Sequence, residues 1–66
     1  MYKRFSKNLR IARKLRRVTQ AELAAAVGVC RNTVSSWENG VTEPNLAALK
    51  TISDYLDVSL DDLFGR

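Results

Sequence analysis

Two short helical stretches separated by only three residues constrain the fold of this chain more than any other feature. Thr19 and Glu22 have the spacing of a capping box, in which each side chain accepts a hydrogen bond from the other residue's backbone N–H. A helix therefore starts at Gln20, and it ends at Gly28, which can adopt the left-handed conformation of a helix C-terminus. Its predicted buried residues are Leu23, Ala24 and Val27. The next helix follows directly after Cys30, so the connection between the two helices is a tight turn.

Apolar residues at helical spacing predict one helix before this pair, over about residues 4–16, and place the second member of the pair at residues 31–39. The buried side of the earlier helix is predicted to be the stripe Phe5, Leu9, Ala12 and Leu15. In the later helix, Val34 and Trp37 face the core and Gly40 ends the helix. We interpret Trp37 as a core residue because aromatic stacking on bases is mainly a feature of single-strand recognition.

Two further helices are predicted in the C-terminal third of the chain. Asn45 can cap a fourth helix, whose predicted buried stripe is Leu46, Leu49, Ile52 and Leu56. Ser59 and Asp62 repeat the spacing of the first cap, so a final short helix begins at Leu60. No segment shows the period-two alternation of a strand. We therefore expect an all-α fold of five helices, and residues 1–66 are expected to form a single domain.

The charge distribution indicates an anionic partner. The net charge is +4, and the chain carries eight basic and no acidic residues from Lys3 to Arg17, but two basic and six acidic residues from Asn32 onward. One cationic side of this kind favours nucleic acid as the partner. Ordinary solvation of a helix surface explains the basic run equally well when charge is considered alone.

Several classes of function are disfavoured by what the sequence lacks. The N-terminus has no apolar segment of a secretory signal and no apolar run reaches membrane-spanning length, so we expect a cytoplasmic protein without a membrane partner. A single cysteine, Cys30, and no histidine argue against an internal disulfide and a zinc site. No base is placed to activate Ser35, Ser36 or Cys30, and a glycine-rich phosphate loop is absent. We expect no catalytic residue, metal, cofactor or small-molecule ligand.

The outward face of residues 31–39 is short-chained and polar. With Val34 and Trp37 inward, the helical period places four residues outward, and Arg31 has the length to join them: Asn32, Ser35, Ser36 and Asn39. Such a surface fits the DNA major groove, where Arg31 can bond guanine bidentately and Asn32 can bond adenine. The serines are less informative, because a serine can meet any base or a phosphate, or simply be tolerated on a solvated face.

The run QAELAAAVGVCRNTVSSWEN, residues 20–39, resembles the helix-turn-helix of the XRE-like family, the phage repressor and Cro type. The positions that carry the resemblance are the Thr19–Gln20 helix start, the small Ala24, the turn glycine Gly28, the aliphatic Val34 and the ending WENG. Arg13, the Pro44 loop and the tail LDVSLDDLF extend it over almost the whole chain. The resemblance implies a compact five-helix, lambda-repressor-like domain with the helix-turn-helix at the second and third helices.

The resemblance also implies roles for individual residues. The base-reading positions would be Arg31, Asn32 and Ser36, and we include Ser35, which lies on the same face. The phosphate-binding positions would be Gln20 and Asn39, and we include Thr19, which directly precedes Gln20. Arg13 and Glu38 would form a pair that links the first helix to the recognition helix, residues 31–39. Cys30 departs from the family pattern, because Ser, Thr or Asp is a better acceptor at that helix start.

The sequence therefore predicts a sequence-specific, double-stranded DNA-binding transcriptional regulator. One recognition helix reads few base pairs, so a homodimeric repressor on a palindromic operator is expected. The resemblance implies that the dimer interface lies around the fifth helix and includes Val58 and Leu60. Ile11, Leu15 and Phe64 either complete the core or add to the contact between the two subunits. The alternative is a protein-interaction module, such as an antitoxin-like subunit, that uses the same fold.

Overall fold

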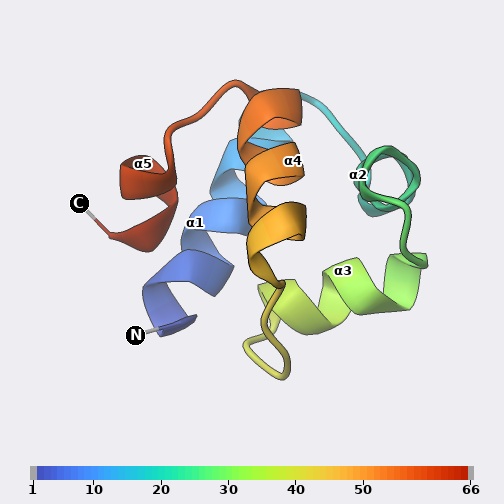
Figure 1. Ribbon diagram of the computed structural model, residues 1–66, viewed down its shortest axis with the longest axis horizontal. Helices are drawn as coiled ribbons and strands as arrows, with labels where there is room; N and C mark the ends of the chain where they lie inside the picture. Colours follow the sequence, from blue (N-terminus) through green and yellow to red (C-terminus); the bar gives the residue numbers. More distant parts are fainter. Residues whose placement is uncertain (1, 66) are drawn as a thin grey trace.

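The computed structural model describes residues 2–65, and its architecture is a bundle of short α-helices without strands in that range (Figure 1). The helices are α1 (Tyr2–Leu15), α2 (Gln20–Val27), α3 (Arg31–Glu38), α4 (Leu46–Leu56) and α5 (Leu60–Phe64). The all-α, five-helix prediction is confirmed. Relative to the predicted bounds, α1 lies slightly nearer the N-terminus, and α3 ends one residue early, with Asn39 as its C-cap. Met1 and Arg66, which the predicted domain includes, lie outside the described residues.

Local cap chemistry sets the starts of three helices. The Thr19 hydroxyl accepts from the Glu22 N–H at 3.0 Å, and the Glu22 carboxylate accepts from the Thr19 N–H at 2.8 Å. The Asn45 side chain accepts from the N–H three residues later at 2.8 Å, as the Ser59 hydroxyl does at 3.0 Å. Each bond satisfies a backbone donor that has no partner within its helix.

The helix-turn-helix depends on two glycines in the left-handed region. Gly28 ends α2 with φ of 88°, and its N–H donates to the Ala24 carbonyl at 2.8 Å. Gly40 follows α3 with φ of 75° and donates to the Trp37 carbonyl, while the next N–H reaches back to the Ser36 carbonyl at 2.9 Å. These paired bonds form a Schellman motif, which lets the chain leave α3 sharply.

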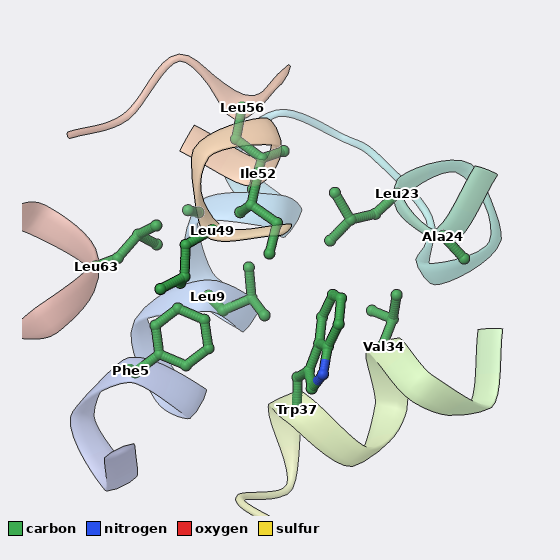
Figure 2. Close-up of a cluster of buried hydrophobic side chains, with 11 residues drawn as sticks. Phe5, Leu9, Leu23, Ala24, Val34, Trp37, Leu49, Ile52, Leu56 and Leu63 are labelled. Carbon is green, nitrogen blue, oxygen red and sulfur yellow. The ribbon is translucent and has the colours of Figure 1, made fainter. Parts of the chain in front are cut away.

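Apolar side chains from all five helices meet in one core (Figure 2). The buried residues are Phe5, Leu9, Ala12, Leu23, Ala24, Val34, Trp37, Leu49, Ile52, Leu56 and Leu63. Trp37 is 4% exposed and stands between α1 and α2 in Figure 2, so it belongs to the core as predicted. Phe64 completes the core, since its ring stacks on Phe5 with centroids 5.1 Å apart.

Two predicted core residues are on the surface. Leu15 is 77% exposed and Leu46 is 75% exposed, so both buried stripes were predicted one residue too long. Leu15 is the last residue of α1 and Leu46 the first of α4, and at these ends no neighbouring helix covers the stripe. Val27 is half-buried rather than buried.

The arrangement of the helices leaves α3 at one edge of the bundle. α3 packs against α2 and α1, α2 also packs against α4, and α5 packs against α1 and α4. In Figure 1, α5 and α3 lie on opposite sides of α1 and α4. The side of α3 that carries Val34 and Trp37 therefore covers the core, and its opposite side faces outward. Among residues 2–65, every helix is too short or too polar to cross a membrane.

Candidate nucleic-acid interface

The outward side of α3 carries the predicted base-reading residues. Arg31 and Asn32 are exposed, whereas Ser35 and Ser36 are partly buried. Asn32 and Ser36 line one side of an open groove of about 510 Å³. The other wall of this groove comes from the loop before α4 and from the start of α4: Thr42, Glu43, Pro44, Asn45 and Ala48. This wall could not be predicted from the sequence, because only the tertiary position of the loop brings it beside α3.

A buried ion pair fixes the opposite edge of α3. Arg13 from α1 is 8% exposed and Glu38 from α3 is 3% exposed. Arg13 donates Nε–H to Glu38 Oε2 at 2.5 Å and Nη2–H to Oε1 at 3.0 Å, and its Nη1 also donates to the Val18 carbonyl at 2.8 Å. This two-point geometry is the strongest form of an arginine–carboxylate contact. Because the only carboxylate of α3 is turned inward, the helix presents no acidic side chain on its outward face.

Several donors keep Glu38 ionised. Burial by itself would raise the pKa of this carboxyl group. Hydrogen bonds from Arg13 and Gln20, and the charges of Arg13 and Arg10, outweigh that effect and lower the pKa below its ordinary value. Arg10 Nε lies 3.9 Å from Glu38 Oε1. Among the described side chains, those of residues 4–65, no buried nitrogen or oxygen lacks a hydrogen-bond partner, so the polar interior around this pair is satisfied.

Gln20, predicted to bind phosphate, is engaged with two other side chains. Its Nε2 donates to Glu38 Oε1 at 3.0 Å, and its Oε1 accepts from Arg31 Nη1 at 3.1 Å. The side chain is partly buried at the junction of α2 and α3. Thr19 is exposed at the start of α2, where its hydroxyl serves the capping bond with Glu22.

Asn39, the other predicted phosphate ligand, lies at the opposite end of α3. Its Oδ1 accepts from Arg10 Nη2 at 3.3 Å, and its Nδ2 donates to Ser35 Oγ at 3.4 Å. Arg10 Nη2 also donates to the Glu38 carbonyl at 3.0 Å, which gives one of the last carbonyls of α3 a partner. Asn39, Arg10 and Lys7 line a crevice of about 410 Å³ between α1 and the end of α3. Arg10 was not identified from the sequence, although its spacing of three residues from Arg13 places both on one side of α1.

Cys30 occupies the N-cap of α3 without capping it. Its backbone has N-cap dihedral angles, but its side chain makes no capping hydrogen bond. Sγ lies 3.3 Å from the Thr33 hydroxyl, and this hydrogen bond lowers the pKa of the exposed thiol. The start of α3 is therefore held less firmly by local chemistry than the starts of α2, α4 and α5.

The residues predicted at the dimer contact lie at least partly on the surface. Ile11 is 47% exposed and, with Leu15 and Val58, lines a groove of about 340 Å³ between α1 and the segment that leads into α5. Leu60 is 37% exposed. Ile11, Leu15 and Leu60 are outside the core, whereas Val58 and Phe64 pack against it.

Comparison with known proteins agrees with this geometry. A helix-turn-helix family model matches residues 9–63. The chain is 42% identical over 59 residues to the uncharacterized HTH-type transcriptional regulator YqaE of Bacillus subtilis, a match that covers 89% of this chain and 51% of YqaE. It is 36% identical over 60 residues to the antitoxin PezA of Streptococcus pneumoniae, covering 91% of this chain and 38% of PezA. The chain thus spans about half the length of the first relative and less of the second.

Among solved structures, the fold is similar to that of the P22 c2 repressor in a crystal structure with synthetic operator 9T. The TM-score is 0.84 and the sequence identity 37%, with 89% of each chain covered. The likeness therefore extends to sequence as well as to backbone. With most of its residues matched by the family model, the chain belongs to the XRE-type helix-turn-helix family.

Proposed function

We propose that this protein is a sequence-specific, double-stranded DNA-binding transcriptional regulator that reads the major groove with the outward face of α3. The observation that carries the proposal is the inward turn of Glu38, which leaves that face to arginine, amide and hydroxyl groups. Arg31 and Asn32 are the residues with bidentate base-bonding capacity, and Ser35 and Ser36 add shorter polar contacts. The similarity to a repressor solved with its operator supports the same partner class.

Binding strength in this proposal comes largely from phosphates. The α1 cations and the polar groups at the start of α2 and the end of α3 would meet the backbone of the duplex, with Thr19, Gln20 and Asn39 as the predicted ligands. Residues 1–66 act as one domain in this proposal, and the protein works in the cytoplasm. Since a single α3 reads only a few base pairs, we further propose a homodimer that represses by occupying a palindromic operator, with half-sites about 34 Å apart.

Selection of bound duplexes from a random pool tests the proposal directly. We expect a two-fold symmetric motif and retention of the selected duplex against excess random DNA. Arg31→Ala should lose preference at one base position in each half-site, whereas Lys50→Ala, which removes the same charge from an exposed site on α4, should leave every preference unchanged. Failure to enrich any motif would refute sequence-specific binding, and an Arg31→Ala variant with unaltered preference would refute the assignment of Arg31.

The alternative function is a protein-interaction module. The similarity to the antitoxin PezA and the exposed Ile11 and Leu15 favour it, because apolar surface outside the core can bind another chain. Under this alternative, the selection experiment yields no motif, and Leu15→Asp abolishes binding of a partner protein without changing DNA affinity. Enrichment of a symmetric motif together with a Leu15→Asp variant that still assembles normally would refute it.

A further inference from the structure

The C-terminal end of α3 is completed by a cation from α1. The last four carbonyls of an α-helix have no partner within the helix, and they form the negative end of its dipole, which disfavours an anion. In α3, the backbone N–H groups that follow cover three of these carbonyls at 2.9–3.3 Å, those of Ser35, Ser36 and Trp37. The fourth, that of Glu38, accepts from Arg10 Nη2 at 3.0 Å. Arg10 therefore offsets the negative end of α3.

Arg10 also fixes the orientation of the Asn39 amide. A guanidinium group only donates hydrogen bonds, so the amide oxygen must face it, and Asn39 Oδ1 accepts from Arg10 Nη2 at 3.3 Å. The amide nitrogen, Nδ2, donates to Ser35 Oγ at 3.4 Å, which uses one of its two hydrogens. Asn39 is exposed and therefore keeps one N–H for a ligand that accepts hydrogen bonds.

The side chains around this amide form a cationic crevice. Lys7, Arg10 and Asn39 line the space of about 410 Å³ between α1 and the end of α3. The Glu38 carboxylate is buried and bound by Arg13, so its charge is compensated inside the fold. The Arg10 side chain, in contrast, is 46% exposed. A phosphate of DNA carries a negative charge and accepts hydrogen bonds, so it matches both the charge of this crevice and the free N–H of Asn39.

We propose that Arg10 is a positioning residue for DNA, which offsets the negative end of α3 and orients Asn39 so that its free N–H group donates to a phosphate. This inference rests on the proposed DNA-binding function and deepens it. It makes the phosphate contact predicted for Asn39 depend on a side chain of α1. Because the phosphate group is the same beside every base, the pair should change affinity and leave base preference unaltered.

The first test separates the geometry of Arg10 from its charge. Arg10→Lys keeps the positive charge, but an ammonium group cannot reproduce the planar contact that joins the Glu38 carbonyl to Asn39. Dissociation constants are measured by fluorescence anisotropy for the selected duplex and for a random duplex. We expect Asn39→Ala to weaken both by about 10-fold, the lower value for a hydrogen bond to a charged group. Arg10→Lys should weaken both to a similar extent.

Arg4→Lys is the matched control. Arg4 also donates from α1 to a carbonyl just after a helix, that of Gly65 following α5, and α5 and α3 lie on opposite sides of α1 and α4 (Figure 1). The control should leave the affinity for both duplexes unchanged, and equal losses in the two variants would overturn the assignment of Arg10. The base preference of Arg10→Lys should match that of the parent, because Arg13 still holds the Glu38 side chain.

A double-variant cycle tests whether Asn39 depends on Arg10. In an Arg10→Lys background, Asn39→Ala should have little further effect, because the amide has already lost its orientation. If Arg10 acts only through its charge, Arg10→Lys binds like the parent and Asn39→Ala weakens binding equally in both backgrounds, and that result would overturn the proposal. Urea unfolding gives the unfolded fraction of each variant. A loss of affinity that disappears once this fraction is taken into account would also overturn it.

NMR of the free protein keeps this inference distinct from the proposed function. The side-chain NH2 group of Asn39 should be ordered in the parent and in Arg4→Lys, and more mobile in Arg10→Lys. Equal mobility in all three would overturn the positioning role even where DNA binding is specific. If selection yields no motif, sequence-specific binding fails by itself. A loss of random-duplex affinity in Arg10→Lys would then still support the phosphate contact, and its absence would overturn that contact.

Discussion

Replacing Glu38 by glutamine should remove much of the stability of this protein. The carboxylate accepts two hydrogen bonds from Arg13 and one from Gln20 while only 3% exposed. Glutamine nearly preserves the volume but loses the charge, and its NH2 group would face donors instead of accepting from them. Arg13 would keep its bond to the Val18 carbonyl but remain buried without a counter-ion.

The magnitude follows from this uncompensated charge. Breaking one side of a buried ion pair typically costs about 3–5 kcal/mol. At about 0.05–0.15 kcal/mol per residue, a chain of this size has a total stability of roughly 3–10 kcal/mol. The variant should therefore be partly unfolded or close to it. For a small domain, each kcal/mol corresponds to about 4–8 °C in Tm, so we expect Tm to fall by at least about 12 °C.

Urea unfolding followed by the fluorescence of Trp37 measures this loss, because that side chain is buried in the core. Arg13→Met combined with Glu38→Leu is the matched control. It removes both charges, and an apolar pair of similar volume is often nearly neutral or stabilising relative to a buried ion pair. The double variant should therefore be more stable than Glu38→Gln alone. A loss below about 1 kcal/mol in Glu38→Gln, or an equal loss in the double variant, would refute the reasoning.

Three other predictions follow from the same structure. The folded-state pKa of Glu38 is lower than its ordinary value of 4.5, so its stabilisation is complete above that value and is lost as pH falls through the folded-state pKa. Acid unfolding curves should then show the gap in stability between the parent and Glu38→Gln closing as pH falls, and a constant gap would contradict this. Cys30→Ser should stabilise the folded protein by roughly 0.5–1 kcal/mol in thermal unfolding. This is the lower part of the range for a helix cap, because the Thr33 N–H already bonds the Cys30 carbonyl. Cys30→Ala should give no such gain, and equal Tm values for the two variants would argue against a capping effect. Leu15→Ser should change urea stability by less than about 0.5 kcal/mol, whereas Leu9→Ala should cost about 2–5 kcal/mol, and similar losses would mean that Leu15 is buried in solution.

The helix starts were predictable because their chemistry is local. At Thr19, Asn45 and Ser59, the side-chain acceptor and the backbone donor are three residues apart, so the sequence contains both partners of each bond. Leu15 and Leu46 were mispredicted for the opposite reason. A helical period identifies which side of a helix is apolar, but the length of that side that becomes buried depends on how far the neighbouring helices extend.

The site was predictable in its residue types but not in its connections. The outward placement of Arg31 and Asn32 follows from the inward placement of Val34 and Trp37 on the same helix. The bond between Gln20 and Glu38 joins residues 18 positions apart, and its geometry depends on the crossing of α2 and α3. No period or cap spacing encodes that crossing. The groove wall at residues 42–45 depends in the same way on where the loop settles after Gly40.

The position of α3 must come from tertiary contacts, because its local stability is low. It has eight residues and no side-chain cap at its start, and isolated helices of that length are marginal in water. Val34 and Trp37 attach it to the core, but apolar contacts alone tolerate small rotations about the helix axis. Two arginines of α1 remove that freedom: Arg13 binds the Glu38 side chain and Arg10 binds the Glu38 carbonyl. A rotation of α3 would have to break directional bonds to a buried charge, so the direction in which its polar face points is set mainly by α1.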